Sequence, residues 1–163
     1  MAGYPTHGQI RAARSMLGLK QKDLASKANI TRSVLLGLEQ PGRKLPDNTA
    51  LSKLRDAIEA EGLVLLDATG DAGEGVRWKE PSGKLWVECL RHGRAILGYS
   101  LDDLAERSGV GRYAISRIES GNLSRTPEPS ARRLREVLFE NGVVLLGEED
   151  NLGAGVRLRS GIG

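Results

Sequence analysis

Apolar residues recur at three- and four-residue spacing along most of the chain, as in helices with one buried face. In the first half, this spacing predicts helices over Gln9–Leu17 and Asn48–Glu61, each ended by a glycine. Two shorter helices joined by a turn are predicted within Lys20–Glu39. The apolar runs Leu63–Leu66 and Val76–Lys79 flank a glycine-rich acidic turn and are predicted to pair as a β-hairpin.

The second half has the same order of predicted elements. A helix longer than its counterpart in the first half comes first, then two short helices around a glycine turn, a fourth helix that begins at a Thr-Pro cap, and a hairpin. These elements are placed at Leu85–Leu97, Ser100–Gly121, Thr126–Asn141, and Val143–Leu146 with Val156–Arg159.

A shift of 80 positions aligns the chain with itself without a gap. The repeated segments include Asp-Leu-Ala, Val-Leu-Leu and Gly-Val-Arg, which begin at residues 23, 64 and 75 and recur at 103, 144 and 155. A gap-free match of this length predicts two copies of one fold. We expect a first domain over residues 1–79, a linker over 80–84 and a second domain over 85–163.

Composition narrows the class of protein. The 163 residues are 39% hydrophobic but only 4% aromatic, so the expected cores are aliphatic and small. A net charge of +3 permits binding to nucleic acid without requiring it. The single cysteine, Cys89, excludes an intrachain disulfide and a cysteine-cluster zinc site. No apolar run approaches the length of a membrane span.

The segment Ser100–Gly121 carries the most specific motif. Ser100 is a good N-cap, Gly109 suits a turn with positive φ, and Val110 is placed to fill that turn. The pattern A-x-x-x-G-V-x-x-x-x-I-S-R-I-E-x-G resembles the helix-turn-helix of Cro and phage-repressor (XRE) proteins. The resemblance implies a mainly α fold, with two lambda-repressor-like helix-turn-helix domains that are each followed by a short β-hairpin.

The resemblance also implies two structural ion pairs and an outward row that faces DNA. The ion pairs are Arg14 with Glu39 and Arg94 with Glu119, each between the first and third helices of a copy. In the second copy, the outward row can hydrogen-bond to base edges and phosphates. It consists of Arg112, Tyr113, Ser116 and Arg117, with Ser100 at the start of the preceding helix.

The first copy has a different outward row. Leu36 and Gly37 stand where the second copy has Ser116 and Arg117, so the helix offers an apolar patch instead of hydrogen-bond donors. Two hypotheses follow: both copies bind DNA at different half-sites, or the first copy contacts protein through Leu36. The candidate DNA contacts in this copy are Gln21, Lys22, Thr31, Arg32, Ser33 and Leu36.

Two basic loops extend the candidate interface. They are expected either to clamp phosphates or to be ordinary solvated loops, and their residues are Arg43, Lys44, Asn122 and Arg125. The hairpins carry more apolar residues than a lone ribbon can bury, so we expect them to pair with each other. This pairing can form an intrachain pseudo-dimer or a homodimer.

The sequence contains no credible catalytic triad, phosphate loop or calcium loop, so we expect neither enzymatic activity nor a cofactor or metal. The function favoured by the resemblance is sequence-specific binding of double-stranded DNA by a transcriptional regulator, most commonly a repressor, in the cytoplasm of a bacterium or a phage host. The alternative is a protein-interaction module, such as an antiactivator or an antitoxin-like partner, that uses the same helical face.

Overall fold

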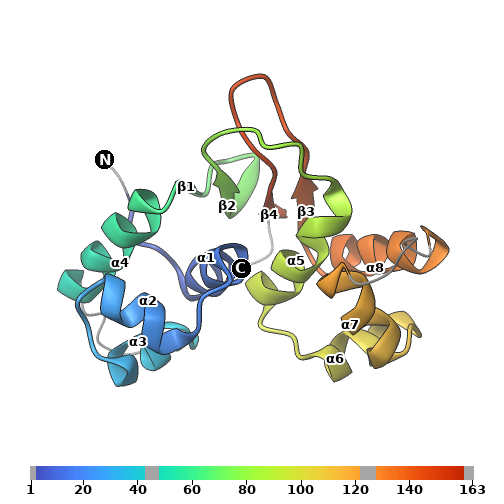
Figure 1. The fold of residues 1–163 in the computed structure, drawn as a ribbon, viewed down its shortest axis with the longest axis horizontal. Helices are drawn as coiled ribbons and strands as arrows, with labels where there is room; N and C mark the ends of the chain where they lie inside the picture. Colours follow the sequence, from blue (N-terminus) through green and yellow to red (C-terminus); the bar gives the residue numbers. More distant parts are fainter. Residues whose placement is uncertain (1–2, 43–47, 122–127, 160–163) are drawn as a thin grey trace.

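The computed structural model describes residues 3–42, 48–121 and 128–159. Figure 1 shows helical lobes on either side of a shared sheet, which has four strands. We call α1 through β2 the first half and η1 through β4 the second half. The elements are α1 His7–Leu17, α2 Gln21–Lys27, α3 Arg32–Leu38, α4 Asn48–Ala60, β1 Leu63–Leu66, β2 Ala72–Trp78, the 3₁₀ helix η1 Trp86–Cys89, α5 Leu90–Leu97, α6 Leu101–Ser108, α7 Arg112–Ser120, α8 Glu128–Glu140, β3 Val143–Leu146 and β4 Gly155–Arg159.

Helix α1 begins two residues earlier than the apolar spacing predicts, because its N-terminus carries a capping box. The hydroxyl of Thr6 accepts from the backbone N–H of Gln9 at 3.2 Å, and the Gln9 side chain accepts from the N–H of Thr6 at 2.9 Å. The helix ends where expected, at Gly18, whose φ of 66° is left-handed.

The prediction of one long helix over Leu85–Leu97 is wrong. The chain forms η1 first and then α5, which has 8 residues against 11 in α1. The backbone N–H of Glu88 bonds to the carbonyl of Leu85, three residues back, so this turn is tighter than an α-helix. Because η1 packs against α7 and β3, it departs from a simple extension of α5.

The two hairpins pair with each other inside the chain. The strand order is β1-β2-β4-β3, and all neighbouring strands are antiparallel. Strand β2 begins at Ala72 rather than at Val76, because its first residue already pairs with Arg159 of β4. At the centre of the sheet Val76 lies opposite Val156, its equivalent 80 residues later. The sheet therefore lies on a pseudo-two-fold axis that relates the two halves.

The repeated Gly-Val-Arg segment forms this junction. Gly75 lies opposite Arg157, and Arg77 lies opposite Gly155. A Cβ atom on Gly155 would lie 2.2 Å from the carbonyl oxygen of Val76, and one on Gly75 would lie 2.4 Å from that of Val156. Only glycine allows the strands to approach so closely.

Each arginine of the repeated segment crosses to the other hairpin. Arg77 is 5% exposed and donates to the carbonyl oxygens of Gly153 and Gly147, both in or beside the β3–β4 loop. Arg157 donates in the same way to the carbonyl oxygens of Gly73 and Asp67. These bonds satisfy carbonyls in the hairpin loops and at the start of β2, and they tie the two hairpins together.

A second contact between the halves is made by α1 and α5, which pack side by side (Figure 1). Arg11 of α1 caps the carboxyl end of α5, donating from Nε to the Ala95 carbonyl at 2.9 Å and from Nη2 to the Ile96 carbonyl at 2.8 Å. Ser15 Oγ lies 2.7 Å from Nδ1 of His92 across the same contact. The core is continuous from one half to the other through these helices and the sheet.

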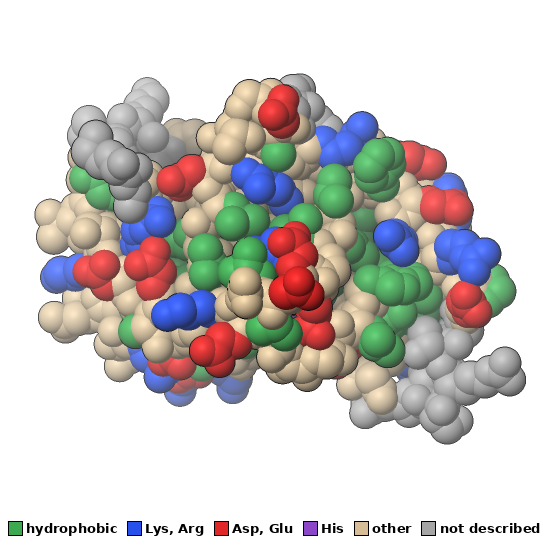
Figure 2. All heavy atoms as spheres, turned by 90° about the horizontal axis from the view of Figure 1, so that it is seen from above, with side chains coloured by type: hydrophobic (Ala, Val, Ile, Leu, Met, Phe, Trp, Pro, Cys, Tyr) green, Lys and Arg blue, Asp and Glu red, His purple; other side chains and the backbone are tan. Residues whose placement is uncertain are grey.

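The outer face of the sheet remains partly open. Figure 2 views the molecule from the sheet side and shows hydrophobic side chains near the centre of this face, next to a group of acidic ones. Val64 and Leu66 are half-buried here, whereas Leu63 and Leu65 point into the core. Within the ranges named above, no helix is long and apolar enough to cross a membrane.

Candidate nucleic-acid interface

Helices α6 and α7 form a capped helical pair. Ser100 and Asp103 form a capping box, and the hydrogen bonds from Ser100, first of all from its backbone N–H, lower the pKa of the Asp103 carboxyl. Gly109 ends α6 with a φ of 75°. Leu104 and Ile115, both fully buried, hold the pair to the core. The Ser100 hydroxyl is thus already engaged with Asp103 inside the capping box, and a contact with DNA requires that it exchange a partner.

The outward face of α7 is open to solvent. Tyr113 is 81% exposed, and Ser116 and Arg117 are also exposed. Among the described residues no side chain binds the Arg117 guanidinium. Arg112 differs, because its Nη1 contacts both carboxylate oxygens of Asp102 at 3.0 and 3.1 Å. A base contact by Arg112 requires that it exchange this partner.

Helices α2 and α3 occupy the corresponding place in the first half. The hydroxyl of Thr31 accepts from the backbone N–H of Val34 and caps α3. Arg32 and Ser33 are exposed, and Leu36 is 43% exposed. The row of α3 therefore ends in an apolar side chain, where α7 presents hydroxyl and guanidinium groups.

The first helix of each pair also differs. Gln21 is half-buried and donates from Nε2 to Glu39 Oε1 at 2.8 Å, so its side chain is turned toward the Arg14–Glu39 ion pair. Lys22, next to it, is exposed. In this conformation Lys22 is accessible to a phosphate, whereas Gln21 hydrogen-bonds to the glutamate of the ion pair.

The two ion pairs fix the C-terminal ends of α3 and α7 to α1 and α5. The Nε–Oε2 distance is 2.8 Å in both, and the glutamate side chains are 2% and 6% exposed. Each arginine also donates to the carbonyl just before the next helix, Arg14 to Leu19 and Arg94 to Tyr99. The pairs therefore set the position of both short helices in each half.

Comparison with known proteins identifies one part of this arrangement. Residues 90–139 match the helix-turn-helix family HTH_3. The match runs from the start of α5 into the last turn of α8 and includes the α6–α7 pair. It gives the second half a Cro/C1-type helix-turn-helix, the domain of DNA-binding transcription regulators. No curated protein and no solved structure matches the chain.

The helix-turn-helix match covers less than a third of the chain, so the α1–α4 arrangement is described by its geometry alone. The predicted loop residues Arg43, Lys44, Asn122 and Arg125 lie outside the described residues. Within the described ranges, no cluster of three or more His, Cys, Asp or Glu side chains could hold a metal ion.

Arg11 and Arg91 are cationic residues to which the sequence pattern gave no role. Both belong to the 80-residue repeat, which marks them as equivalents but does not reveal their surroundings. Arg11 is half-buried at the contact between the halves, and Arg91 is exposed at its edge. Only the packing of α1 on α5 brings them together.

Proposed function

We propose that the chain is a sequence-specific transcription regulator, acting as a repressor, that binds double-stranded DNA through two recognition helices. In this proposal α3 and α7 each enter a major groove. Residues 1–79 form a first helix-turn-helix domain, a linker over 80–84 follows, and residues 85–163 form the second.

The observation that carries the proposal is the pseudo-two-fold junction. Val76 pairs with Val156, and α1 packs on α5, so the halves are arranged like the subunits of a symmetric dimer. Dimeric helix-turn-helix proteins present two recognition helices to half-sites about 34–36 Å apart. Here the recognition helix α7 has an equivalent helix, α3, in the first half of the same chain.

The contacts of the two helices are expected to differ. Arg117, whose guanidinium binds no side chain among the described residues, can bond bidentately to guanine O6 and N7, and Tyr113 can reach a base edge or a phosphate. On α3, Leu36 can make only apolar contact, as with a thymine methyl group. One chain is therefore expected to prefer two unlike half-sites.

Selection of duplexes from a random pool by the full chain tests this proposal. We expect enrichment of an asymmetric site with two conserved segments about one helical turn apart. Arg117→Ala should weaken binding by about 1–3 kcal/mol and relax preference at one base pair. Arg132→Ala, an exposed arginine on α8, serves as the control and should leave the preference unchanged. A pool without enrichment would contradict the proposal.

A second candidate function rests on Leu36. Its 43% exposure beside Gly37 gives α3 an apolar surface suited to holding another protein, as an antiactivator or antitoxin-like partner would. The salt dependence of binding separates the two. Affinity for DNA falls steeply with salt because counterions are released, whereas an apolar protein contact responds weakly.

A further inference from the structure

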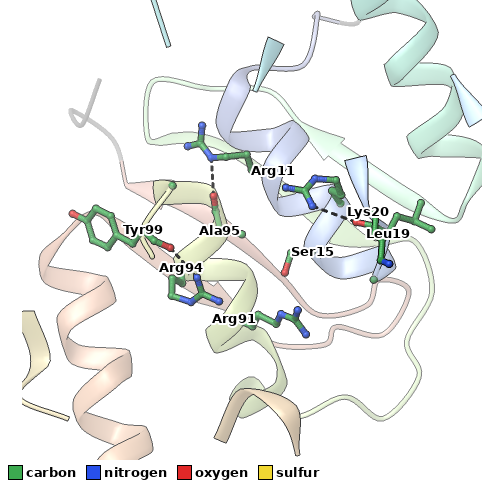
Figure 3. A pocket seen from close by; sticks show the side chains of 11 residues that line it. Arg11, Ser15, Leu19, Lys20, Arg91, Arg94, Ala95 and Tyr99 are labelled. Atoms are coloured by element: carbon green, nitrogen blue, oxygen red, sulfur yellow. Dashed lines mark hydrogen bonds between the residues drawn. The ribbon is translucent and has the colours of Figure 1, made fainter. Parts of the chain in front are cut away.

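A basic cleft opens between α1 and α5, on the pseudo-two-fold axis itself. It has a volume of about 550 Å³, and Figure 3 shows side chains from both halves around it. Of its 11 lining residues, 10 form five pairs whose members lie 80 positions apart, for example Arg11 with Arg91 and Arg14 with Arg94. The remaining residue is Lys20. The cleft is thus built from equivalent positions of the two halves.

The lining is cationic and contains no carboxylate. Arg14 and Arg94 are neutralised by the glutamates behind them. Arg11 is different, because its donors meet the neutral backbone carbonyls of Ala95, Ile96 and Glu39, and the nearby Glu39 carboxylate is already paired with Arg14.

Lys20 and Arg91 supply the free hydrogen-bond donors of the cleft. Both are exposed, and no side chain of the described residues binds either of them. An ammonium and a guanidinium that face one cavity, with the Arg11 guanidinium behind them, are suited to bind a multiply charged oxyanion.

The cleft faces away from the sheet. Its walls come from the carboxyl ends of α1 and α5 and from the residues that lead into α2 and α6, since Lys20 is the N-cap of α2 and Tyr99 precedes the N-cap of α6. Gln9, near the other end of α1, bonds to the sheet through the carbonyls of Leu66 and Gly75. Because it lies on the axis, the cleft is midway between α3 and α7.

We propose that this cleft binds a phosphate group, with Arg91 and Lys20 as the direct ligands and Arg11 as the fixed charge behind them. The phosphate comes either from the DNA backbone between the two half-sites or from a small free phosphate compound. The DNA source rests on the proposed function, whereas the free source does not.

Titration of the full chain with inorganic phosphate, at constant ionic strength set by chloride, tests the free source. Backbone amide NMR signals of residues 18–20 and 98–99 should shift and saturate. The shifts should be lost in Lys20→Gln/Arg91→Gln. The control Lys53→Gln/Arg132→Gln removes two exposed cations elsewhere and should titrate like the wild type.

Duplex binding by the same two double variants tests the DNA source. Lys20→Gln/Arg91→Gln should reduce the slope of log affinity against log salt by about 1–2, with base preference unchanged. The control variant should keep the wild-type slope. The predicted difference between the two variants, in the phosphate titration or in the salt slope of duplex binding, supports the proposal and identifies the source of the phosphate.

The proposal is overturned if phosphate shifts are absent or equal in both variants and the salt slopes of the two variants do not differ. If the wild type binds no duplex, the function proposed above fails, and the phosphate titration alone then tests whether the cleft binds phosphate. Because all four substituted side chains are exposed, thermal unfolding should be near that of the wild type, which verifies that each variant folds.

Discussion

Val76 and Val156 are directly opposed at the centre of the sheet, and the same valine of the repeat supplies both sides of the contact. Both are fully buried. An antiparallel pair in which a residue meets its own equivalent is the geometry of a symmetric dimer interface. Here the interface lies within one chain, so its formation does not depend on protein concentration.

The close approach of the two strands makes Gly155 a sensitive position. Gly155→Ala would place a methyl group 2.2 Å from the Val76 carbonyl and 2.5 Å from the Arg77 Cα, and neither backbone atom can move without opening the sheet. We expect a loss of about 2–3 kcal/mol in the free energy of unfolding, measured by urea denaturation.

Gly147→Ala is the matched control for Gly155→Ala, since a Cβ atom there would meet nothing within 4 Å. It should change stability by less than about 0.5 kcal/mol. Equal effects of the two substitutions would mean that β2 and β4 do not pair as described.

Removing one partner of the Arg94–Glu119 pair should cost far more than removing one partner of an exposed pair of the same length. Glu119→Gln leaves a guanidinium that is 18% exposed without its counter-charge. We expect a cost of about 3 kcal/mol in thermal or urea unfolding. Arg132 and Glu128 also lie 2.8 Å apart, but both are more than 60% exposed. Glu128→Gln should therefore cost at most about 0.5 kcal/mol, and a similar cost for both would refute this account.

Local features were predictable wherever a residue's neighbours in sequence determine its conformation. Gly18 and Gly109 end their helices as expected, and Thr31 caps α3, because each acts within one helical turn. Gly75-Val76-Arg77 was recognisable as a repeated segment. Its role was not, because the partner that requires the glycine is 80 residues away.

The candidate interface was predictable to the same extent. The outward row of α7 follows from helical periodicity, and its residues are exposed. The Arg112–Asp102 contact joins two helices and has no signature in the spacing of either. The basic cleft could not be predicted at all, because it exists only where α1 meets α5.

His92 should make stability depend on pH. Burial, followed by the nearby charges of Arg91 and Lys84, lowers its pKa to about 4 from an ordinary value near 6.5. Between these values the unfolded chain binds a proton that the native protein does not, so stability falls as the pH decreases from about 6.5. Relative to His92→Gln, the free energy of unfolding of the wild type should fall by about 3 kcal/mol by pH 4, because the pKa of His92 is lowered to about 4.

Urea denaturation of the wild type and His92→Gln at pH 7.5, 6, 5 and 4 measures this difference. The contribution of the carboxylates to the pH dependence is common to both proteins and cancels. His7→Gln serves as the comparison. Burial also lowers the pKa of His7, but less, so its effect should have the same sign and be smaller. A difference between wild type and His92→Gln that stays constant with pH would show that His92 is not buried against Ser15.

Transfer of the outward row of α7 to α3 tests whether both helices contact bases, and it rests on the proposed function. Ser33→Tyr, Leu36→Ser and Gly37→Arg give α3 the residues that α7 carries 80 positions later, and Arg32 already matches Arg112. If both helices enter major grooves, the duplexes selected by this variant should change from two unlike half-sites to an inverted repeat of the half-site bound by α7. Binding to that repeat should improve by about 1–3 kcal/mol for each additional base to which α3 hydrogen-bonds. A selected sequence that stays the same as that of the wild type would mean that α3 does not contact bases, and would favour a protein partner for Leu36.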